Sequence, residues 1–235
     1  MINGKRILAI VPARAGSKRL PGKNIKPLAG KPLIQWSIDT ANSSLYLDTV
    51  MVSTDCMDIA TIAKNCNAEV PYIRSAELSD DTATSLDVVL DVLRYYEGQH
   101  QFFDLVLLLQ PTSPLRSVDD INKAIEYFEK KNAAGVISVT ECEHSPLWCN
   151  VLPENNAFDN FIQTENSVRS QDLPTYHRLN GAIYLFDVNS VMINKCLLPT
   201  RNSFAFIMAN ENSIDIDTQL DFTIAEALLL KDISC

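Results

Sequence analysis

Basic side chains are concentrated in one short stretch near the N-terminus. Residues 14–26 hold five of the chain's 20 lysines and arginines, namely Arg14, Lys18, Arg19, Lys23 and Lys26. Because the formal net charge of the chain is −9, this local excess of positive charge indicates a bound anion. Two glycines in the same stretch would let backbone N–H groups approach phosphate oxygens, which the cations neutralise. Since the spacing fits neither a Walker A loop nor a GxGxxG fingerprint, we predict a phosphate-binding loop of another kind.

Two aspartates near the C-terminus form a second candidate site. Asp215 and Asp217 are separated by one residue, so in an extended segment both carboxylates point the same way and could hold Mg²⁺. The alternative is structural: Asp217 or Thr218 could cap the following helix, with Thr218 and Asp221 forming a capping box. The sequence leaves both explanations open.

The elements that would position these groups alternate along the chain. Short apolar runs predict strands at Ile7–Val11, Val50–Ser53, Val70–Ile73, Leu105–Leu109, Val136–Val139, Ala182–Phe186 and Phe204–Ala209. Helical patterns lie at Pro32–Asn42, Met57–Cys66, Ser85–Tyr96, Asp119–Lys130 and Thr218–Lys231. This order predicts an α/β fold with a doubly wound, mostly parallel sheet. The basic loop leaves the carboxyl end of the first strand, the edge at which open α/β sheets bind ligands, and Gln110 follows another strand at the same edge.

One segment breaks the pattern. Residues 141–180 contain polar stretches, three prolines and few regular apolar periods, which suits an inserted arm, a lid or an oligomerisation element. We therefore expect one domain over residues 1–235 with this insertion.

Several classes of function are excluded by composition. A net charge of −9 argues against a general binder of nucleic acid or anionic membranes, and no apolar run is long enough to span a bilayer. The six cysteines show no CxxC spacing, so we expect neither zinc nor a catalytic thiol. The short apolar run near the N-terminus leads into a charged loop instead of a cleavage site, so we expect a cytoplasmic protein.

Taken together, the motifs resemble a known family. Six segments in the same order and spacing are similar to those of the acylneuraminate cytidylyltransferases, which are the CMP-sialic acid synthetases and relatives acting on other nine-carbon acidic sugars. They are residues 12–24 (PARAGSKRLPGKN), Ser53–Asp55, Arg74–Ser85, residues 108–116 (LLQPTSPLR), Arg178–Tyr184 and residues 213–222 (SIDIDTQLDF). The resemblance covers residues 7 to about 227. It implies transfer of CMP from CTP to the sugar's anomeric hydroxyl with release of pyrophosphate, a homodimer, and a segment at 141–180 that crosses to the partner.

The resemblance also assigns roles to individual residues. CTP phosphates and ribose would be held by Arg14, Ser17, Lys23 and Asn24. The cytosine pocket would be lined by Arg74, Ala83 and Ser85. The sugar would contact Gln110, Arg169 and Tyr184, and Mg²⁺ would be bound by Asp215 and Asp217. Arg14, Lys23, Arg169 and Asp217 would act in catalysis, Asp217 either as metal ligand or as general base.

The exact sugar is left open by departures from the family pattern. Trp148 stands where sialate-specific bacterial members carry lysine, and Leu197 and Leu198 replace paired phenylalanines. Legionaminic or pseudaminic acid is therefore an alternative to N-acetylneuraminic acid. An eight-carbon sugar acid with CTP, a UTP-dependent sugar-1-phosphate enzyme and an inactive nucleotide-binding protein are the more distant alternatives.

Overall fold

The computed structural model describes residues 1–159, 161–162, 169–198 and 201–233. Its centre is a six-stranded sheet in the order β4-β1-β5-β7-β6-β8. The strands are β1 (Ile7–Pro12), β4 (Thr49–Ser53), β5 (Leu105–Leu108), β6 (Gly135–Glu141), β7 (His177–Asp187) and β8 (Ser203–Ile207), and a separate two-stranded sheet joins β2 (Pro27–Leu28) to β3 (Lys31–Pro32). β7 pairs antiparallel with β5 and β6, whereas the other neighbours pair parallel. The α/β fold with a mostly parallel sheet is thus confirmed.

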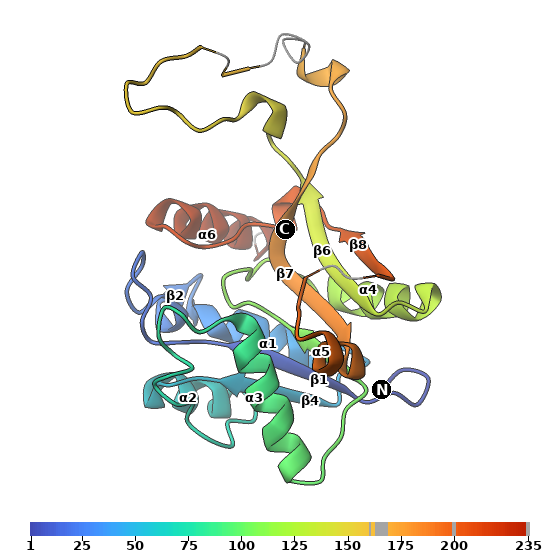
Figure 1. Cartoon of the computed structure of the whole chain (residues 1–235). Coiled ribbons are helices and arrows are strands. Elements are labelled where there is room, and N and C mark those ends of the chain that lie inside the picture. Colours follow the sequence, from blue (N-terminus) through green and yellow to red (C-terminus); the bar gives the residue numbers. More distant parts are fainter. Residues whose placement is uncertain (160, 163–168, 199–200, 234–235) are drawn as a thin grey trace.

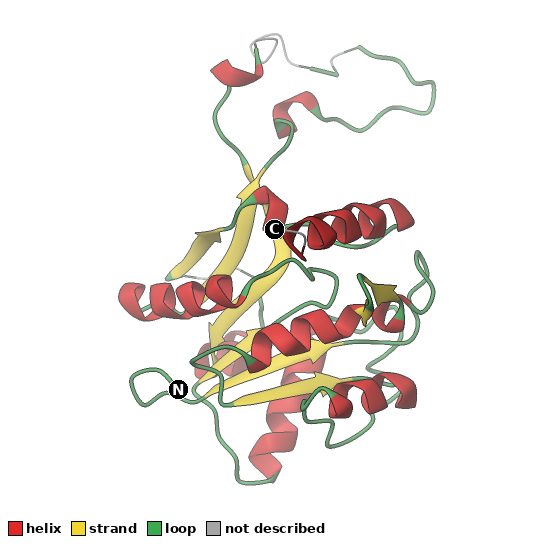
Figure 2. Cartoon of the chain, turned by 180° about the vertical axis from the view of Figure 1, so that it is seen from behind, coloured by secondary structure: helices red, strands yellow, loops and turns green. Residues whose placement is uncertain are grey.

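Helices cover both faces of the sheet (Figures 1 and 2). They are α1 (Leu33–Asn42), α2 (Met57–Asn65), α3 (Ser85–Gly98), α4 (Val118–Lys131), α5 (Val188–Asn194) and α6 (Gln219–Ile233). One core cluster packs apolar residues of α1, α2 and α4 against the sheet, and a second packs α3 and α5 against the opposite face. A third cluster joins α6 to the start of α1 through residues such as Leu33, Ile216 and Phe222. Because Ile216 is fully buried there, the two aspartates on either side of it are fixed relative to the body.

The strand predicted at Val70–Ile73 is wrong. Only the residue before it pairs with the sheet, through the single bridge between Met51 and Glu69. Pro71 has no backbone N–H to donate, so the ladder cannot continue through this segment. The chain instead turns toward the pocket described below.

The irregular segment forms an arm that leaves the body at the ends of β6 and β7 (Figure 1). Its described part contains the short helices η2 (Pro146–Trp148) and η4 (Ser170–Asp172). The predicted boundaries of 141–180 are too wide, because β6 includes Glu141 and β7 already begins at His177. Among the described residues, no helix is long and apolar enough to cross a bilayer.

Candidate nucleotide-binding site

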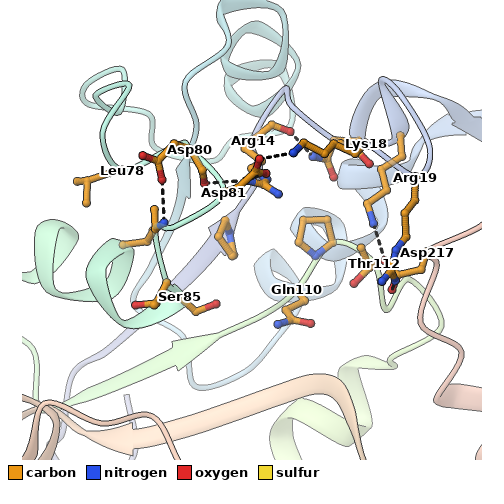
Figure 3. Close-up of a pocket in the computed structure, with 18 of the residues that line it drawn as sticks. Arg14, Lys18, Arg19, Leu78, Asp80, Asp81, Ser85, Gln110, Thr112 and Asp217 are labelled. Atoms are coloured by element: carbon orange, nitrogen blue, oxygen red, sulfur yellow. Dashed lines mark hydrogen bonds and ion pairs between the residues drawn. The ribbon is translucent and has the colours of Figure 1, made fainter. Parts of the chain in front are cut away.

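A pocket of about 540 Å³ lies at the carboxyl ends of β1 and β5 (Figure 3). Its walls come from the basic loop, the loop before α3, the turn after β5 and the segment before α6. Of the residues predicted from the sequence, those lining it are Arg14, Ser17, Lys23, Asn24, Arg74, Ala83, Ser85, Gln110, Asp215 and Asp217. Segments distant in the sequence thus converge on one cavity.

The basic loop is held in shape by its own backbone and by two neighbours. The Ala13 N–H donates to the Ser53 carbonyl at 2.9 Å, and the Ala15 N–H donates to Asp55 Oδ1 at 2.9 Å. The buried Asn24 closes the loop, since its Nδ2 donates to the Arg14 carbonyl at 3.0 Å. Asn24 therefore stabilises the loop, and the Oδ1 atom and second N–H of its amide remain for a ligand.

Two cations of the loop are paired with an aspartate across the pocket. Arg14 Nη1 lies 3.3 Å from Asp81 Oδ1 and also donates to the Asp80 carbonyl at 2.7 Å. Lys18 forms an ion pair with the same Asp81 carboxylate, and this contact lowers the pKa of Asp81. These side chains face one another in Figure 3. Because all three are at least partly exposed, the pairs are weak and an incoming anion can replace them.

Two further cations contact Asp217. Lys23 Nζ lies 3.2 Å from Asp217 Oδ1 and donates to the Ile216 carbonyl at 2.8 Å. Arg19 Nη1 lies 2.7 Å from Asp217 Oδ2. The Lys23 side chain is only 13% exposed, whereas that of Arg19 is 72% exposed. Lys23 is thus a fixed charge inside the pocket, and Arg19 lies at its rim.

The capping alternative for Asp217 is wrong, because Thr218 performs that role. The Thr218 N–H donates to Asp221 Oδ2 at 2.7 Å, and the Asp221 N–H donates to Thr218 Oγ1 at 3.3 Å. This is the predicted capping box between these two residues. The Asp217 carboxylate therefore takes no part in the cap and is directed into the pocket.

Asp215 occupies the pocket wall beside Thr112. Partial burial raises the pKa of its carboxyl, and the neighbouring Asp217 carboxylate acts in the same direction, while a hydrogen bond with Thr112 opposes both. Its side chain nevertheless remains open to solvent. Two carboxylates next to one another are suited to a hard cation shared with phosphate oxygens.

The loop before α3 forms the opposite wall. Arg74 is 5% exposed, and burial lowers the pKa of its guanidinium, whose Nε donates to Ser79 Oγ at 3.0 Å. Asp80 Oδ1 accepts from the Ala83 N–H at 2.9 Å. The Ala83 N–H is therefore occupied, and its carbonyl is the backbone group that can bind a ligand. Ser85 is the first residue of α3, which Thr84 caps.

Two predicted sugar-site residues lie outside this pocket. Tyr184 is in β7, paired with Leu108 and Ile137, and burial followed by the charge of Asp215 raises the pKa of its hydroxyl. Arg169 is exposed in the arm, just before η4. The chain alone therefore does not bring Arg169 to the nucleotide pocket.

Several pocket residues were not predicted as ligands from the sequence. Asp80, Asp81 and Thr112 line the cavity. The signal was present, because the two aspartates belong to the Arg74–Ser85 motif and Thr112 belongs to LLQPTSPLR. Their contacts depend on which loops face each other, which local patterns do not indicate.

Comparisons with known proteins identify the family. The family model described as cytidylyltransferase matches residues 8–207. The chain is 39% identical to CMP-N,N'-diacetyllegionaminic acid synthase of Legionella pneumophila, covering 95% of this chain and 96% of that protein. It is 35% identical to pseudaminic acid cytidylyltransferase of Campylobacter jejuni, covering 94% and 95% respectively. With N-acylneuraminate cytidylyltransferase of Streptococcus agalactiae it shares 37% identity over 92% of this chain and 51% of that one.

Solved structures support the fold. A CMP:2-keto-3-deoxy-manno-octonic acid synthetase complexed with CTP has a TM-score of 0.73 and 16% identity, covering 97% of this chain and 100% of that one. The 4-diphosphocytidyl-2C-methyl-D-erythritol synthase of Anaerococcus prevotii has a TM-score of 0.63 and 19% identity, again covering 97% and 100%. At these identities the likeness concerns the fold alone. The family match and the full-length relatives go further: this chain is a member of the cytidylyltransferase family, in the group that includes the N-acylneuraminate, legionaminate and pseudaminate enzymes.

Proposed function

We propose that this protein transfers CMP from CTP to the anomeric hydroxyl of a nine-carbon acidic sugar and releases pyrophosphate. The observation that carries the proposal is the meeting of the basic loop with the aspartate pair, where Lys23 Nζ lies 3.2 Å from Asp217 Oδ1. A triphosphate needs cations, and a divalent metal needs carboxylates, so their convergence on one pocket suits a metal-dependent reaction at phosphorus.

When the triphosphate binds, the cations of the basic loop exchange their aspartate partners for phosphate oxygens. Arg14 and Lys18 leave Asp81 for phosphate oxygens, whereas Lys23 stays in place and exchanges its contact with Asp217 for one with the phosphate that is attacked. Each broken ion pair is partly exposed and weak, whereas the new contacts are made to a highly charged ligand. Ser17 and Asn24 hold the phosphates and ribose from the same loop.

The base is bound at the other end of the pocket. Arg74, Ala83 and Ser85 line that wall, and the Ala83 carbonyl is an acceptor of the kind the cytosine amino group requires. A uracil ring presents a carbonyl oxygen there instead. We therefore expect CTP to be preferred over UTP.

A magnesium ion fits the donor set. Asp215 and Asp217 would hold it, in keeping with the usual protein share of one or two carboxylates while substrate phosphates and water supply the remainder. When bound, Mg²⁺ would neutralise and orient the phosphate oxygens. Two carboxylates do not fill the coordination shell of Mg²⁺, so we expect phosphate oxygens and water to supply its other ligands.

The chemical step is an in-line displacement. The anomeric oxygen forms a bond to the α-phosphorus of CTP, the bond from that phosphorus to the bridging oxygen of pyrophosphate breaks, and the hydroxyl proton passes to Asp217 or to solvent water. Arg14 and Lys23 stabilise charge that develops on the triphosphate. Asp217 is either a metal ligand or the base that accepts the proton at a carboxylate oxygen. Mg²⁺ titration of the CTP complex by calorimetry separates the roles, because Asp217→Asn should weaken Mg²⁺ binding far more if Asp217 is a ligand than if it contributes only a nearby charge.

The sugar site is completed by Gln110, Tyr184 and Arg169. Gln110 lies at the pocket wall after β5, whereas Arg169 is carried by the arm. The arm exposes several apolar side chains, including Val151 at 89% and Phe158 at 67%, with Phe158 stacked on Phe161. We propose that the arm packs against a second copy in a homodimer and that Arg169 serves the pocket of the partner subunit.

The sugar is a nonulosonic acid, and a legionaminic-type acid is the first candidate. Support comes from the full-length relatives for legionaminic and pseudaminic acid, and from Trp148 and the apolar Leu197 and Leu198 in place of the sialate pattern. We place the reaction in the cytoplasm and expect no nucleic-acid or membrane partner.

The test is a panel of sugar acids incubated with CTP and Mg²⁺, with products read by mass spectrometry. It includes N-acetylneuraminic, legionaminic, diacetyllegionaminic and pseudaminic acids and an eight-carbon sugar acid. A CMP conjugate of a nine-carbon acid supports the proposal. Conjugation of the eight-carbon acid alone, or of none, contradicts it.

A further inference from the structure

A long bulge, residues 180–183, interrupts β7 beside the pocket. Ile137 of β6 pairs with Tyr184, but Val139 pairs with Leu179, so residues 180–183 stand opposite Ser138 alone. Such bulges re-aim side chains and are over-represented next to active sites. This one contains Asn180–Ile183, the centre of the Arg178–Tyr184 motif.

The bulge is built from buried, satisfied polar groups. The fully buried Ser138 hydroxyl donates to Asn180 Oδ1 at 2.5 Å and accepts from the Ile183 N–H at 2.8 Å. Asn180 Nδ2 donates to Ser213 Oγ at 2.9 Å, next to the segment that carries the aspartate pair. These side chains replace the strand-to-strand bonds that the bulge removes.

Two carbonyls of the bulge are bound by the turn after β5. Ser113 Oγ donates to the Asn180 carbonyl at 3.3 Å. Arg116, which is 2% exposed, donates from Nη1 to the Ala182 carbonyl at 2.6 Å and from Nη2 to Ser37 Oγ at 2.8 Å. Burying a guanidinium is costly, and the hydrogen bonds of Arg116 join the turn to β7 and α1. The turn and the bulge are therefore one rigid unit.

Within this unit, Gly181 contacts the Gln110 side chain. Gly181 has φ +73°, and a Cβ added to it would lie 2.7 Å from Gln110 Oε1. The next nearest atoms, Ser113 Oγ and Gln110 Cδ, would be 3.5 and 3.6 Å away. Among the described residues, none forms a hydrogen bond with the Gln110 side-chain amide. The end of the Gln110 side chain thus lies against bare backbone, and its polar atoms stay available to a ligand.

We propose that the bulge at Asn180–Ile183 positions the Gln110 amide for the sugar, with Gly181 as the surface that sets its place. The inference rests on the proposed function, because Gln110 is the sugar contact there. Gly181 is a positioning residue: it acts only through Gln110. An added methyl group would displace the flexible end of this side chain and leave the nucleotide wall untouched.

A double-mutant cycle tests this directly. Gly181→Ala should lower kcat/KM for the sugar by about tenfold or more, the scale of one lost hydrogen bond in a polar site, and leave CTP affinity within about twofold. In the Gln110→Ala background the same substitution should have no further effect, since there is no amide to displace. Gly30→Ala is the matched control: Gly30 has φ +85° and nothing within 4 Å of the added Cβ, so it imposes comparable backbone strain without a collision.

Other results overturn the proposal. These are an unchanged sugar kcat/KM in Gly181→Ala, an equal loss in the Gln110→Ala background, or a parallel loss of CTP affinity. If Gly181→Ala does not fold, Ser113→Ala loosens the bulge more gently and should show a smaller sugar-specific loss that also vanishes without Gln110. If the wild type conjugates no sugar acid, the proposed function fails, and crystal structures still decide the inference: Gln110 must move in Gly181→Ala and stay in Gly30→Ala.

Discussion

Replacing Asp217 with asparagine separates the catalytic role of this residue from any structural one. The substitution keeps the size of the side chain and an oxygen that can accept from Lys23, but it removes the negative charge. Thr218 and Asp221 cap α6 without help from Asp217. A broken cap and a cavity are therefore both absent, and the structural change is the loss of charge from the contacts with Arg19 and Lys23.

The expected cost in stability is small. The ion pair with Arg19 joins a 72% exposed side chain to one that is 44% exposed, a class worth about 0–1 kcal/mol. Lys23 keeps its hydrogen bond to the Ile216 carbonyl. For a chain of this size, about 1 kcal/mol corresponds to a change in Tm of about 2–4 °C.

The expected cost in turnover is much larger. Loss of a preorganised charge at the reacting phosphate lowers kcat by about 10²–10³, equivalent to about 2.7–4 kcal/mol. The assay is pyrophosphate release under saturating CTP, sugar acid and Mg²⁺, with a melting curve on the same protein. Thr218→Ala is the control, because it should cost about 0.5–2 kcal/mol of stability through the lost cap and leave turnover within about threefold. Near-normal turnover in Asp217→Asn would refute this reasoning, whether or not its Tm falls as far as that of the control.

Four further substitutions test other parts of the structure. Lys23→Ala should raise the barrier measured by kcat/KM for CTP by about 2–4 kcal/mol, because this largely buried cation has no substitute at that position; an unchanged value would remove it from the phosphate site. Asp81→Asn should lower the KM for CTP by up to about fivefold at low salt, since it frees two cations of the basic loop, and the gain should shrink as salt is added. Arg116→Met should lower the free energy of unfolding by about 1–3 kcal/mol in urea melts, because the Ala182 carbonyl loses its buried donor; unchanged stability would show that this bond is dispensable. Phe158→Asp should convert the proposed dimer into monomers in sedimentation experiments, and a wild type that sediments as a monomer would contradict the arm's role.

Much of the fold follows from local sequence. Buried strands of a mostly parallel sheet are apolar throughout, which identified β1, β4 and β5 closely, and the capping residues Thr84 and Ser117 mark the starts of α3 and α4. The strand expected at residues 70–73 failed because Pro71 cannot extend a ladder. The position of β7 between β5 and β6 was not predictable from local pattern, because it depends on where the chain returns from the arm.

Some features of the candidate site were likewise predictable from local sequence, and others were not. The basic loop and the aspartate pair were recognisable because residue type and position at strand ends are local properties. The partners Asp81 and Thr112, and the contact between Gly181 and Gln110, arise from loops meeting in space. A glycine with positive φ suits any tight turn, so the sequence does not indicate that Gly181 lies against the Gln110 side chain.

Sugar-dependent release of pyrophosphate from CTP tests the central claim most directly. The wild-type protein, supplied with Mg²⁺ and the preferred nine-carbon acid, should release one pyrophosphate for each CMP-sugar formed, with UTP far less effective and with Lys23→Ala strongly impaired. Pyrophosphate release that does not depend on the sugar, equal use of UTP, or no release with any acid of the panel would contradict the account.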